Sequence, residues 1–566
     1  MRRICLVVLA ALLLSILSAC GIGGDGATPN GGPTGVPANA LVLRMLYGSE
    51  KELWLKAATE TFNQQQSKSS SGKPIFIEAV PMGSADSMER ILSGQDQAQI
   101  WSPASSILVP IANERWAAAH NGEQLVDSAP PPLVLSPVVI AMWRPMAEAL
   151  GWPAKPLGWG DIAELAASGK TWADFNRPEW GPFQFGHTHP DYSNSGITSI
   201  LATAYAGAGK TRGLTVADVQ SAPVAKTLGD VERAVIHYGE STGFFGRQMF
   251  SRGPAYLSAA VLYENLVVEA NDKTKYPNLS LPVVAVYPKE GTFWSDHPFA
   301  VLKTSTVSDE QRQAAETYRA FLMSQPQQQA ALQFGFRPAD PSVAIGAPIS
   351  EANGVDPKQP QTLLEVPRAD VTTAVRQLWS AQKKRVEVQI VLDTSGSMED
   401  EGRLESAKTA LRTFIGQLAD GDSLGITVFN NAATELTPLG EIGPKRQEVL
   451  DRVGGLIPSG GTRLVDSVQE AYKTMQAQPP GQAIRAVIVL TDGADNRSTT
   501  TQEQLLSLLG ADKEGYGIKV FTIAYGTGTD VNTDLLKSIA DASGAKSYTS
   551  NPSDIDRVYK DIATFF

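Results

Sequence analysis

The stretch V-E-V-Q-I-V-L-D-T-S-G-S-M, residues 386–398, runs from a strand pattern directly into a polar loop. Its apolar half, residues 386–392, is rich in β-branched side chains and is typical of a buried parallel strand. Directly after it, Asp393, Ser395 and Ser397 offer a carboxylate and two hydroxyls at alternate positions. Such hard oxygen ligands suit Mg²⁺, Mn²⁺ or Ca²⁺ better than a metal that prefers thiolates. The stretch therefore predicts a strand that opens into a metal-binding loop, although this motif alone also fits a Ser/Gly-rich turn without metal.

Two later segments offer further oxygen ligands. Thr462 lies in P-S-G-G-T-R-L, just before a helical pattern of apolar residues. An apolar strand pattern at residues 484–490 is followed by Thr491-Asp492-Gly493. The chain thus presents D-x-S-x-S, then T, then T-D-G. This combination is harder to explain as turns without a metal than the first motif alone.

These motifs resemble the von Willebrand factor type A family over residues 385–566. In that family a metal-ion-dependent adhesion site is assembled from these three loops at the carboxyl edge of a doubly wound, Rossmann-like sheet. The resemblance implies a divalent ion, most readily Mg²⁺, or Mn²⁺ or Ca²⁺, and a protein partner that presents an acidic residue. It implies the metal ligands Asp393, Ser395, Ser397, Thr462 and Asp492.

The composition is that of a globular, multi-domain protein. A length of 566 residues is too large for a single core and predicts about three domains. Hydrophobic residues make up 42% and charged residues 19%, which provides enough material for sizeable cores. The formal net charge is −11 and no basic stripe is present, which argues against a general nucleic-acid binder. The basic cluster at residues 383–385 fits the solvated start of a strand better than a binding patch.

The first 40 residues predict export and lipid anchoring. A basic start and an apolar run fill residues 1–19, which is typical of a signal peptide. The sequence Leu17-Ser18-Ala19-Cys20 resembles the lipobox of bacterial lipoproteins, which implies that Cys20 carries acyl chains such as palmitate. A plain secretory signal or an uncleaved anchor is the alternative. Residues 20–40 then form a Gly/Pro-rich flexible linker, so we expect the protein on the extracytoplasmic face of the cell membrane.

Residues 41–345 carry strand and helix patterns that predict an α/β clamshell of two lobes joined by two crossovers. Strand patterns are repeatedly followed by loops rich in serine, where helix starts offer free N–H groups to an anion or polar group. This stretch resembles the bacterial extracellular solute-binding proteins with a two-stranded hinge. The predicted contacts to a small polar or anionic solute are Ser49, Ser84, Ser105, Ser193, Ser195 and Tyr263.

Parts of the clamshell region also fit a different role. Serines are ordinary helix caps, and the clamshell could have lost its solute and serve as a stalk. His187 and His189, with Asp191 nearby, could bind a metal, but they fit better as groups that orient the adjacent serine loop. Residues 346–384 are predicted to form a linker to the last domain.

The sequence favours a binding protein over an enzyme. No H-E-x-x-H, G-x-S-x-G or paired-thiol motif occurs, and no general base is placed by sequence beside the metal loops. We therefore expect a lipid-anchored adhesion protein whose last domain binds a metal and a partner carboxylate. The alternative is a solute receptor of an ABC-type uptake system, in which the last domain serves only as a docking module.

Overall fold

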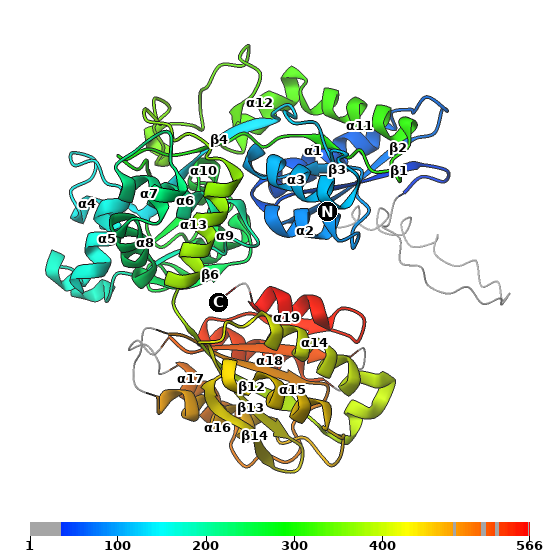
Figure 1. Cartoon of the computed structure of the whole chain (residues 1–566), viewed down its shortest axis with the longest axis vertical. Helices are drawn as coiled ribbons and strands as arrows, with labels where there is room; N and C mark the ends of the chain where they lie inside the picture. Colours follow the sequence, from blue (N-terminus) through cyan, green and yellow to red (C-terminus); the bar gives the residue numbers. More distant parts are fainter. Residues whose placement is uncertain (1–35, 479–482, 511–516, 527–530, 564, 566) are drawn as a thin grey trace, which may run out of the picture.

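The computed structural model describes residues 36–478, 483–510, 517–526, 531–563 and 565. Figure 1 shows two α/β lobes side by side, with a third α/β body beneath them. We call these bodies the first lobe, the second lobe and the C-terminal domain. The two-lobed clamshell followed by a doubly wound domain, predicted from the sequence, is confirmed.

The first lobe is built on a four-stranded sheet in the order β10-β3-β1-β2. Along β1, Leu43 and Tyr47 pack on one face against Trp54 of α1, whereas Leu46 packs on the opposite face with Met88 of α2. Helices therefore cover both faces of the sheet. Its elements are β1 (Leu41–Gly48), α1 (Glu52–Gln65), β2 (Ile75–Met82), α2 (Ser84–Leu92), β3 (Ile100–Ser102), α3 (Val109–Ala119), β10 (Ala300–Val301), α11 (Asp309–Leu322) and α12 (Gln325–Gln333).

The second lobe has a seven-stranded sheet in the order β11-β4-β7-β5-β6, with β8 and β9 also paired to β4. Its strands are β4 (Val134–Trp143), β5 (Phe185–Thr188), β6 (Val235–Gly239), β7 (Ala259–Tyr263), β8 (Val283–Val286), β9 (Trp294–Ser295) and β11 (Arg337–Pro338). Its helices are α4 (Arg144–Ala149), α5 (Trp159–Ser168), α6 (Asn194–Ala208), α7 (Val216–Val219), α8 (Ala222–Ala234), α9 (Thr242–Arg252) and α10 (Glu264–Ala270).

Antiparallel crossovers connect the two lobes. The chain enters the second lobe through β4 and returns beside it, with Ser136 opposite Ser295 in β9. Shortly after, Ala300 pairs with Trp101 of the first lobe. A further passage leaves α12 and pairs Arg337 with β4. The two crossovers predicted from the sequence are thus accompanied by a third one, which the sequence pattern did not reveal.

The C-terminal domain contains a six-stranded sheet in the order β14-β13-β12-β15-β16-β17, parallel except for the edge strand β14. Neighbouring residues of β15 alternate between two cores: Val487 and Val489 pack with α16, and Ile488 and Leu490 with α14 and α19. Its elements are β12 (Val386–Asp393), α14 (Arg403–Gln417), β13 (Ser423–Phe429), β14 (Ala433–Glu441), α15 (Arg446–Gly454), α16 (Leu464–Gln476), β15 (Ile484–Thr491), α17 (Gln502–Gly510), β16 (Lys519–Tyr525), α18 (Thr533–Ser543), β17 (Ser547–Ser550) and α19 (Ile555–Ala563).

Residues 346–384, the predicted linker, are packed against the second lobe over much of their length. Helix α13 (Ala369–Gln382) contacts that lobe, and Trp379 makes edge-on ring contacts with His189 and Tyr238. The C-terminal domain also contacts the second lobe directly, because Arg252 donates a hydrogen bond of 3.0 Å to the Ala545 carbonyl. The domain therefore lies against the second lobe and does not hang from a free tether.

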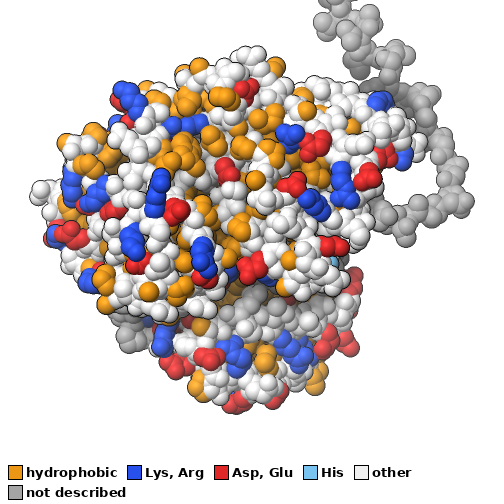
Figure 2. All heavy atoms as spheres, turned by 45° about the horizontal axis from the view of Figure 1, so that its top comes forward, with side chains coloured by type: hydrophobic (Ala, Val, Ile, Leu, Met, Phe, Trp, Pro, Cys, Tyr) orange, Lys and Arg blue, Asp and Glu red, His pale blue; other side chains and the backbone are white. Residues whose placement is uncertain are grey.

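Charged side chains of both signs are mixed on the face that Figure 2 draws, without a region of one sign. Within the described ranges, no helix is both long and apolar enough to cross a membrane. The predicted signal peptide and Cys20 lie outside the described residues, so lipid anchoring stays a prediction.

Candidate functional site

The predicted metal loops meet at one edge of the C-terminal sheet. Numbered within the domain, its strands have the spatial order 3-2-1-4-5-6, which reverses direction between β12 and β15. These two strands are parallel neighbours with Leu392 opposite Leu490, so Asp393 and Thr491 end side by side. In open α/β sheets, ligands bind at the carboxyl ends of strands at such a switch point. Topology alone therefore places D-x-S-x-S beside T-D-G.

Asp393 is fully buried at the end of β12. One carboxylate oxygen accepts a 2.7 Å hydrogen bond from the Ser395 amide, and the other accepts a 2.5 Å bond from the Thr491 hydroxyl. Burial raises the pKa of Asp393 to about 6, and the nearby Asp492 carboxylate acts in the same direction. The chain thus holds a carboxylate in a place where ionisation is costly unless a cation lies nearby.

The remaining oxygens form a connected set around Asp393. The Ser395 and Ser397 hydroxyls lie 3.1 Å apart, and Ser397 donates a 2.8 Å hydrogen bond to Asp492 Oδ1. A Cβ atom on Gly493 would lie 3.2 Å from Thr462 Oγ1 and 3.9 Å from Ser397 Oγ. The structure therefore brings together all five residues predicted as metal ligands.

Main-chain hydrogen bonds hold the second loop against the first. The Gly396 amide donates to the Gly460 carbonyl at 3.1 Å, and the Ser459 amide donates to the Thr394 carbonyl at 2.8 Å. A third contact fixes Thr462 itself, whose amide donates to Asn496 Oδ1 at 3.0 Å. Thr462 therefore reaches the site although 69 residues separate it from Asp393 in the chain.

Arg403, at the start of α14, is a site residue that the sequence analysis missed. Its Nη1 donates a 2.8 Å hydrogen bond to Asp492 Oδ2, and the Asp492 side chain is fully buried. The Asp492 carboxylate also raises the pKa of the Arg403 guanidinium. A basic residue at a helix start gives no sequence signal for such a role, since it usually belongs to the solvated surface.

The donor set fits a hard divalent cation. It combines two carboxylates with three hydroxyls, all of them oxygen ligands of the kind that Mg²⁺ and Ca²⁺ accept. The Arg403 guanidinium already contacts the Asp492 carboxylate and supplies positive charge there, as a bound metal ion would. Within the described residues, no group of three His, Cys, Asp or Glu side chains is placed to hold a metal. Hydroxyls are therefore an essential part of this candidate site.

The six predicted solute contacts are all buried. Each of them bonds to another protein group, and Ser49 does so across the interface between the lobes. Ser49 of the first lobe meets Ser241 of the second at 2.9 Å and accepts a 3.1 Å bond from the Gly243 amide. Ser84 accepts from the Ala104 amide, Ser105 caps the turn at Ile107, Ser193 and Ser195 contact Thr242, and Tyr263 accepts from Asn194.

The lobes are closed on each other in this structure. The main-chain amides of Ala85 and Asp86, at the start of α2, donate to the Tyr192 carbonyl of the second lobe at 3.1 and 3.0 Å. Asn265 donates a 3.2 Å bond to the Glu50 carbonyl. A helix start that could receive an anion is therefore occupied by a carbonyl of the opposite lobe.

Four buried polar atoms of the two lobes have no hydrogen-bond partner in the described part of the chain: Ser102 Oγ, Asn194 Oδ1, Ser295 Oγ and His297 Nε2. One of these residues, His297, contacts a buried ion pair in which Lys51 Nζ lies 2.8 Å from Glu50 and 3.4 Å from the Pro103 carbonyl. The other ring nitrogen of His297 contacts both members of this pair. Buried polar atoms normally have partners, so these four atoms could accept or donate further hydrogen bonds.

His187 and His189 have ordinary structural surroundings. His187 Nε2 lies 3.0 Å from Glu232 Oε1, and its Nδ1 lies 2.8 Å from the Thr188 carbonyl. His189 packs against Trp379, and burial lowers its pKa to about 3. The His189 carbonyl accepts a 3.0 Å bond from the Ser193 amide, and the His189 Nδ1 atom lies 3.2 Å from the Asp191 amide, so His189 contacts the serine loop as the orienting role requires.

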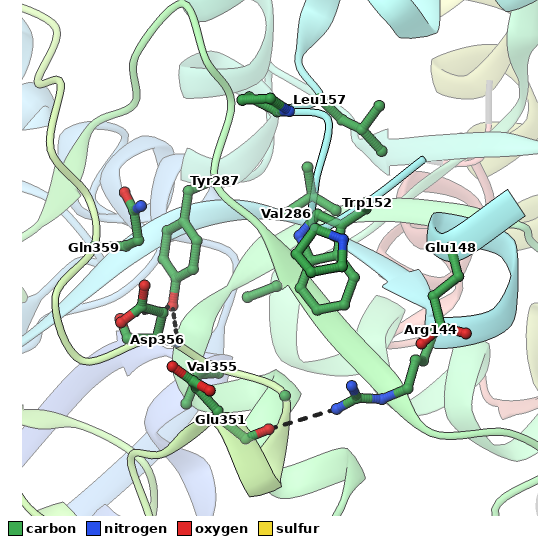
Figure 3. A pocket seen from close by; sticks show the side chains of 14 residues that line it. Arg144, Glu148, Trp152, Leu157, Val286, Tyr287, Glu351, Val355, Asp356 and Gln359 are labelled. Carbon is green, nitrogen blue, oxygen red and sulfur yellow. Dashed lines mark hydrogen bonds between the residues drawn. The ribbon is translucent and has the colours of Figure 1, made fainter. Parts of the chain in front are cut away.

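A pocket of about 440 Å³ opens on the second lobe, away from every residue that the sequence analysis selected. Figure 3 shows the rings of Trp152 and Tyr287 at its wall, with Arg144 bonded to the Glu351 carbonyl at 3.4 Å. Asp356 also lines it, and its amide donates to the Tyr287 hydroxyl at 3.1 Å. These polar groups already bond within the protein, so the pocket by itself selects no ligand.

The fold and the sites define a two-lobed binding protein with a metal-type loop cluster on its last domain. Residues 43–337 match the family of bacterial extracellular solute-binding proteins, and residues 387–563 match the von Willebrand factor type A domain. The first match covers more than half of the chain, so the protein belongs to the bacterial extracellular solute-binding proteins. It carries a C-terminal von Willebrand factor type A domain, and both resemblances inferred from the sequence are confirmed.

Curated relatives match only part of the chain. A UPF0353 protein of Mycolicibacterium paratuberculosis is 25% identical over 207 residues, which cover 32% of this chain and 61% of that protein. Calcium-activated chloride channel regulator 1 of Bos taurus is 27% identical over 173 residues, 30% of this chain and 18% of that protein. The chain therefore spans less than two thirds of the length of these relatives.

Solved structures resemble the two parts separately. A periplasmic thiamin binding protein is 13% identical, with a TM-score of 0.44, and the match covers 64% of this chain and 100% of that one. A von Willebrand factor type A protein from Catenulispora acidiphila is 23% identical, with a TM-score of 0.29, and covers 32% and 43%. These likenesses do not identify a solute or a partner.

Proposed function

We propose that this protein is an envelope-tethered binding protein whose C-terminal domain docks a partner carboxylate on a divalent ion. The ligands are Asp393, Ser395, Ser397, Thr462 and Asp492. A bound Mg²⁺ supplies an electrophile that keeps some of its water and can accept a partner's Asp or Glu in exchange. Solute-binding and type A domains both fit a binding role, and no catalytic group enters the proposal.

One observation carries this proposal: five oxygen donors from three separate loops converge at the switch point of the sheet. Four of these residues are buried, whereas Ser397 is exposed, so the cluster reaches solvent on one side. Three of the five donors are neutral hydroxyls, which leaves more positive charge on the ion than a shell of three or four carboxylates would. The arrangement therefore favours an ion that still attracts an anionic group from outside.

A short peptide with one central Asp in a neutral sequence is expected to bind the full chain in Mg²⁺, because its carboxylate can enter the metal shell. The matched peptide with Asn in that position should bind at least about tenfold more weakly. Fluorescence anisotropy in Mg²⁺ and in EDTA measures both. Equal binding of the two peptides, or binding that EDTA does not change, would contradict the proposal.

We also propose the tether itself: removal of residues 1–19, acylation of Cys20, and a spacer at residues 20–40 that separates the lobes from the membrane. Two acyl chains are what stable anchoring requires. The mass of the N-terminal peptide of the native protein measures this. An unmodified cysteine, or a chain that retains the signal, would rule it out.

We propose a small polar solute in the cleft as a second function, and the unpartnered buried atoms favour it. Asn194, Ser295 and His297 have unused hydrogen-bonding atoms, and the Lys51–Glu50 ion pair beside His297 has no net charge, so this part of the lobe interface would suit a polar solute of low charge. If this solute is the main ligand, the protein would be an uptake receptor and the type A domain its docking module. A clamshell without solute would instead serve as a stalk.

A thermal-shift screen of oxyanions, sugars and amino acids is expected to find a stabilising compound. A ligand at about 100 times its Kd adds about 2.7 kcal/mol to the free energy of unfolding. Asn194→Ala should remove the shift, whereas Trp152→Ala, in the separate pocket on the second lobe, should keep it. If Trp152→Ala removes the shift and Asn194→Ala keeps it, the solute binds in that pocket instead. If no compound shifts Tm, the clamshell is a stalk.

A further inference from the structure

The backbone before α14 places Arg403 beside the metal loops. Glu401 and Gly402 both have positive φ, +54° and +67°, so two consecutive left-handed residues turn the chain directly into the helix. A non-glycine residue pays steric strain in that region. Arg403 is anchored at its backbone too, because its carbonyl accepts a 3.1 Å bond from the Tyr525 hydroxyl. This local geometry fixes a cationic side chain at the rim of the site.

The charge of Arg403 acts on one predicted metal ligand. Asp492 is fully buried and its oxygens are shared: Oδ1 accepts from Ser397 at 2.8 Å and Oδ2 accepts from Arg403 at 2.8 Å. A buried carboxylate without a cation is costly, and the guanidinium offsets part of that cost. Within the described part of the site, Arg403 is the cation that forms an ion pair with Asp492.

The contact is not an ideal ion pair. Arg403 binds Asp492 through Nη1 alone, and its buried Nε has no hydrogen-bond partner among the residues that the structure describes. The nearest other carboxylate, Glu401, lies 3.7 Å away and is largely exposed. Arg–carboxylate pairs are frequently bidentate, as that of Arg337 with Glu264 is at 2.8 and 2.7 Å. The Nε–H group of Arg403 thus lacks a hydrogen bond, and the guanidinium could gain one if it moved away from Asp492.

We propose that Arg403 is a tethered cation that neutralises Asp492 when the site holds no divalent ion and competes with such an ion for that carboxylate. This inference rests on the proposed metal site. The positive charge of Arg403 repels a metal ion at short range and therefore lowers the metal affinity of the site. When no metal is bound, the same charge stabilises the Asp492 carboxylate and with it the metal-free domain. Arg403 would then set the range of Mg²⁺ or Mn²⁺ concentration in which the domain can capture a partner.

Arg403→Gln tests this with Mn²⁺ as the probe, since glutamine keeps a hydrogen-bond donor but loses the charge. Calorimetric titration of the full chain should give Mn²⁺ binding at least about tenfold tighter than in wild type, because a repelling unit charge has been removed at close range. Arg403→Lys, which keeps the charge, should stay within about threefold of wild type. In EDTA the glutamine variant should have a lower Tm than wild type, and saturating Mn²⁺ should close that gap.

Each result has a distinct meaning. Unchanged or weaker Mn²⁺ binding by Arg403→Gln, with normal binding by wild type, overturns the inference and leaves the proposed metal site intact. Absence of Mn²⁺ binding in wild type overturns the proposed function and the inference with it. If the variant folds only with Mn²⁺, the inference is supported. If it stays unfolded at saturating Mn²⁺, Arg403 is structural and the inference is wrong.

Discussion

Asp393→Asn is expected to abolish Mg²⁺ and Mn²⁺ binding by the C-terminal domain while leaving its fold intact. The change removes one of two negative charges from the donor set but keeps the size of the side chain and an oxygen that accepts a hydrogen bond. Mutating a residue that only hydrogen-bonds to a metal ligand typically lowers metal affinity by about 10–100-fold. Loss of a charged ligand should therefore exceed about a hundredfold.

Titration calorimetry with both metals, and the Tm in EDTA, measure the two parts of this prediction. The Tm in EDTA should not fall, because the buried carboxylate whose pKa is raised is replaced by a neutral group. Glu399→Gln is the matched control: Glu399 lies in the same loop but is exposed, so its loss should leave the metal heats nearly unchanged. Equal heats for wild type and Asp393→Asn would mean that the loops are structural.

The position of the metal loops could be predicted from the sequence because each motif follows a strand or precedes a helix that is visible as an apolar pattern. Parallel strands leave their carboxyl ends at one edge, so residues 393 and 492, which follow the neighbouring strands β12 and β15, had to approach each other. Thr462 follows no strand, and the resemblance to the type A family placed it. Strand β14 was missed for the opposite reason. Its sequence A-T-E-L-T-P-L-G-E contains a proline and few apolar residues, which is tolerated only because it lies at the edge of the sheet.

The contacts between the two lobes could not be predicted from the sequence. Serines at helix starts were chosen as solute contacts, and several of them instead bond to other protein groups, because a hydroxyl serves equally well as a cap or a lobe-to-lobe contact. The unpartnered groups of Asn194, at the start of α6, and His297, in a loop, belong to no motif. These two residues are about 100 positions apart in the chain, and only the folded structure brings their segments together. A local sequence pattern contains no information about such a contact.

Gly243→Ala is expected to hold the two lobes apart. Gly243 lies in the first turn of α9, and a Cβ atom there would come within 2.4 Å of the Ser49 carbonyl oxygen and 2.9 Å of the Glu50 amide nitrogen, both on the first lobe. These are main-chain atoms of a buried turn, so they cannot move aside as a flexible side chain would. Overpacking of this kind costs about 1–3 kcal/mol, which should shift the equilibrium from the closed toward an open state by roughly fivefold to a hundredfold.

Gly416→Ala provides the matched comparison, because Gly416 also lies in a helix, α14, and a Cβ atom there would meet nothing within 4 Å. Replacing a helical glycine by alanine ordinarily stabilises by about 0.5–1 kcal/mol, so this control should raise Tm slightly and leave the shape unchanged. For Gly243→Ala, small-angle X-ray scattering should show a larger radius of gyration, and hydrogen exchange should increase at residues 49–51. The compound found in the thermal-shift screen should also lose its stabilising effect, since both lobes contribute to the cleft wall. If the two glycine variants behave alike, Ser49 and Gly243 do not meet in solution, and the closed cleft cannot be the solute-binding state.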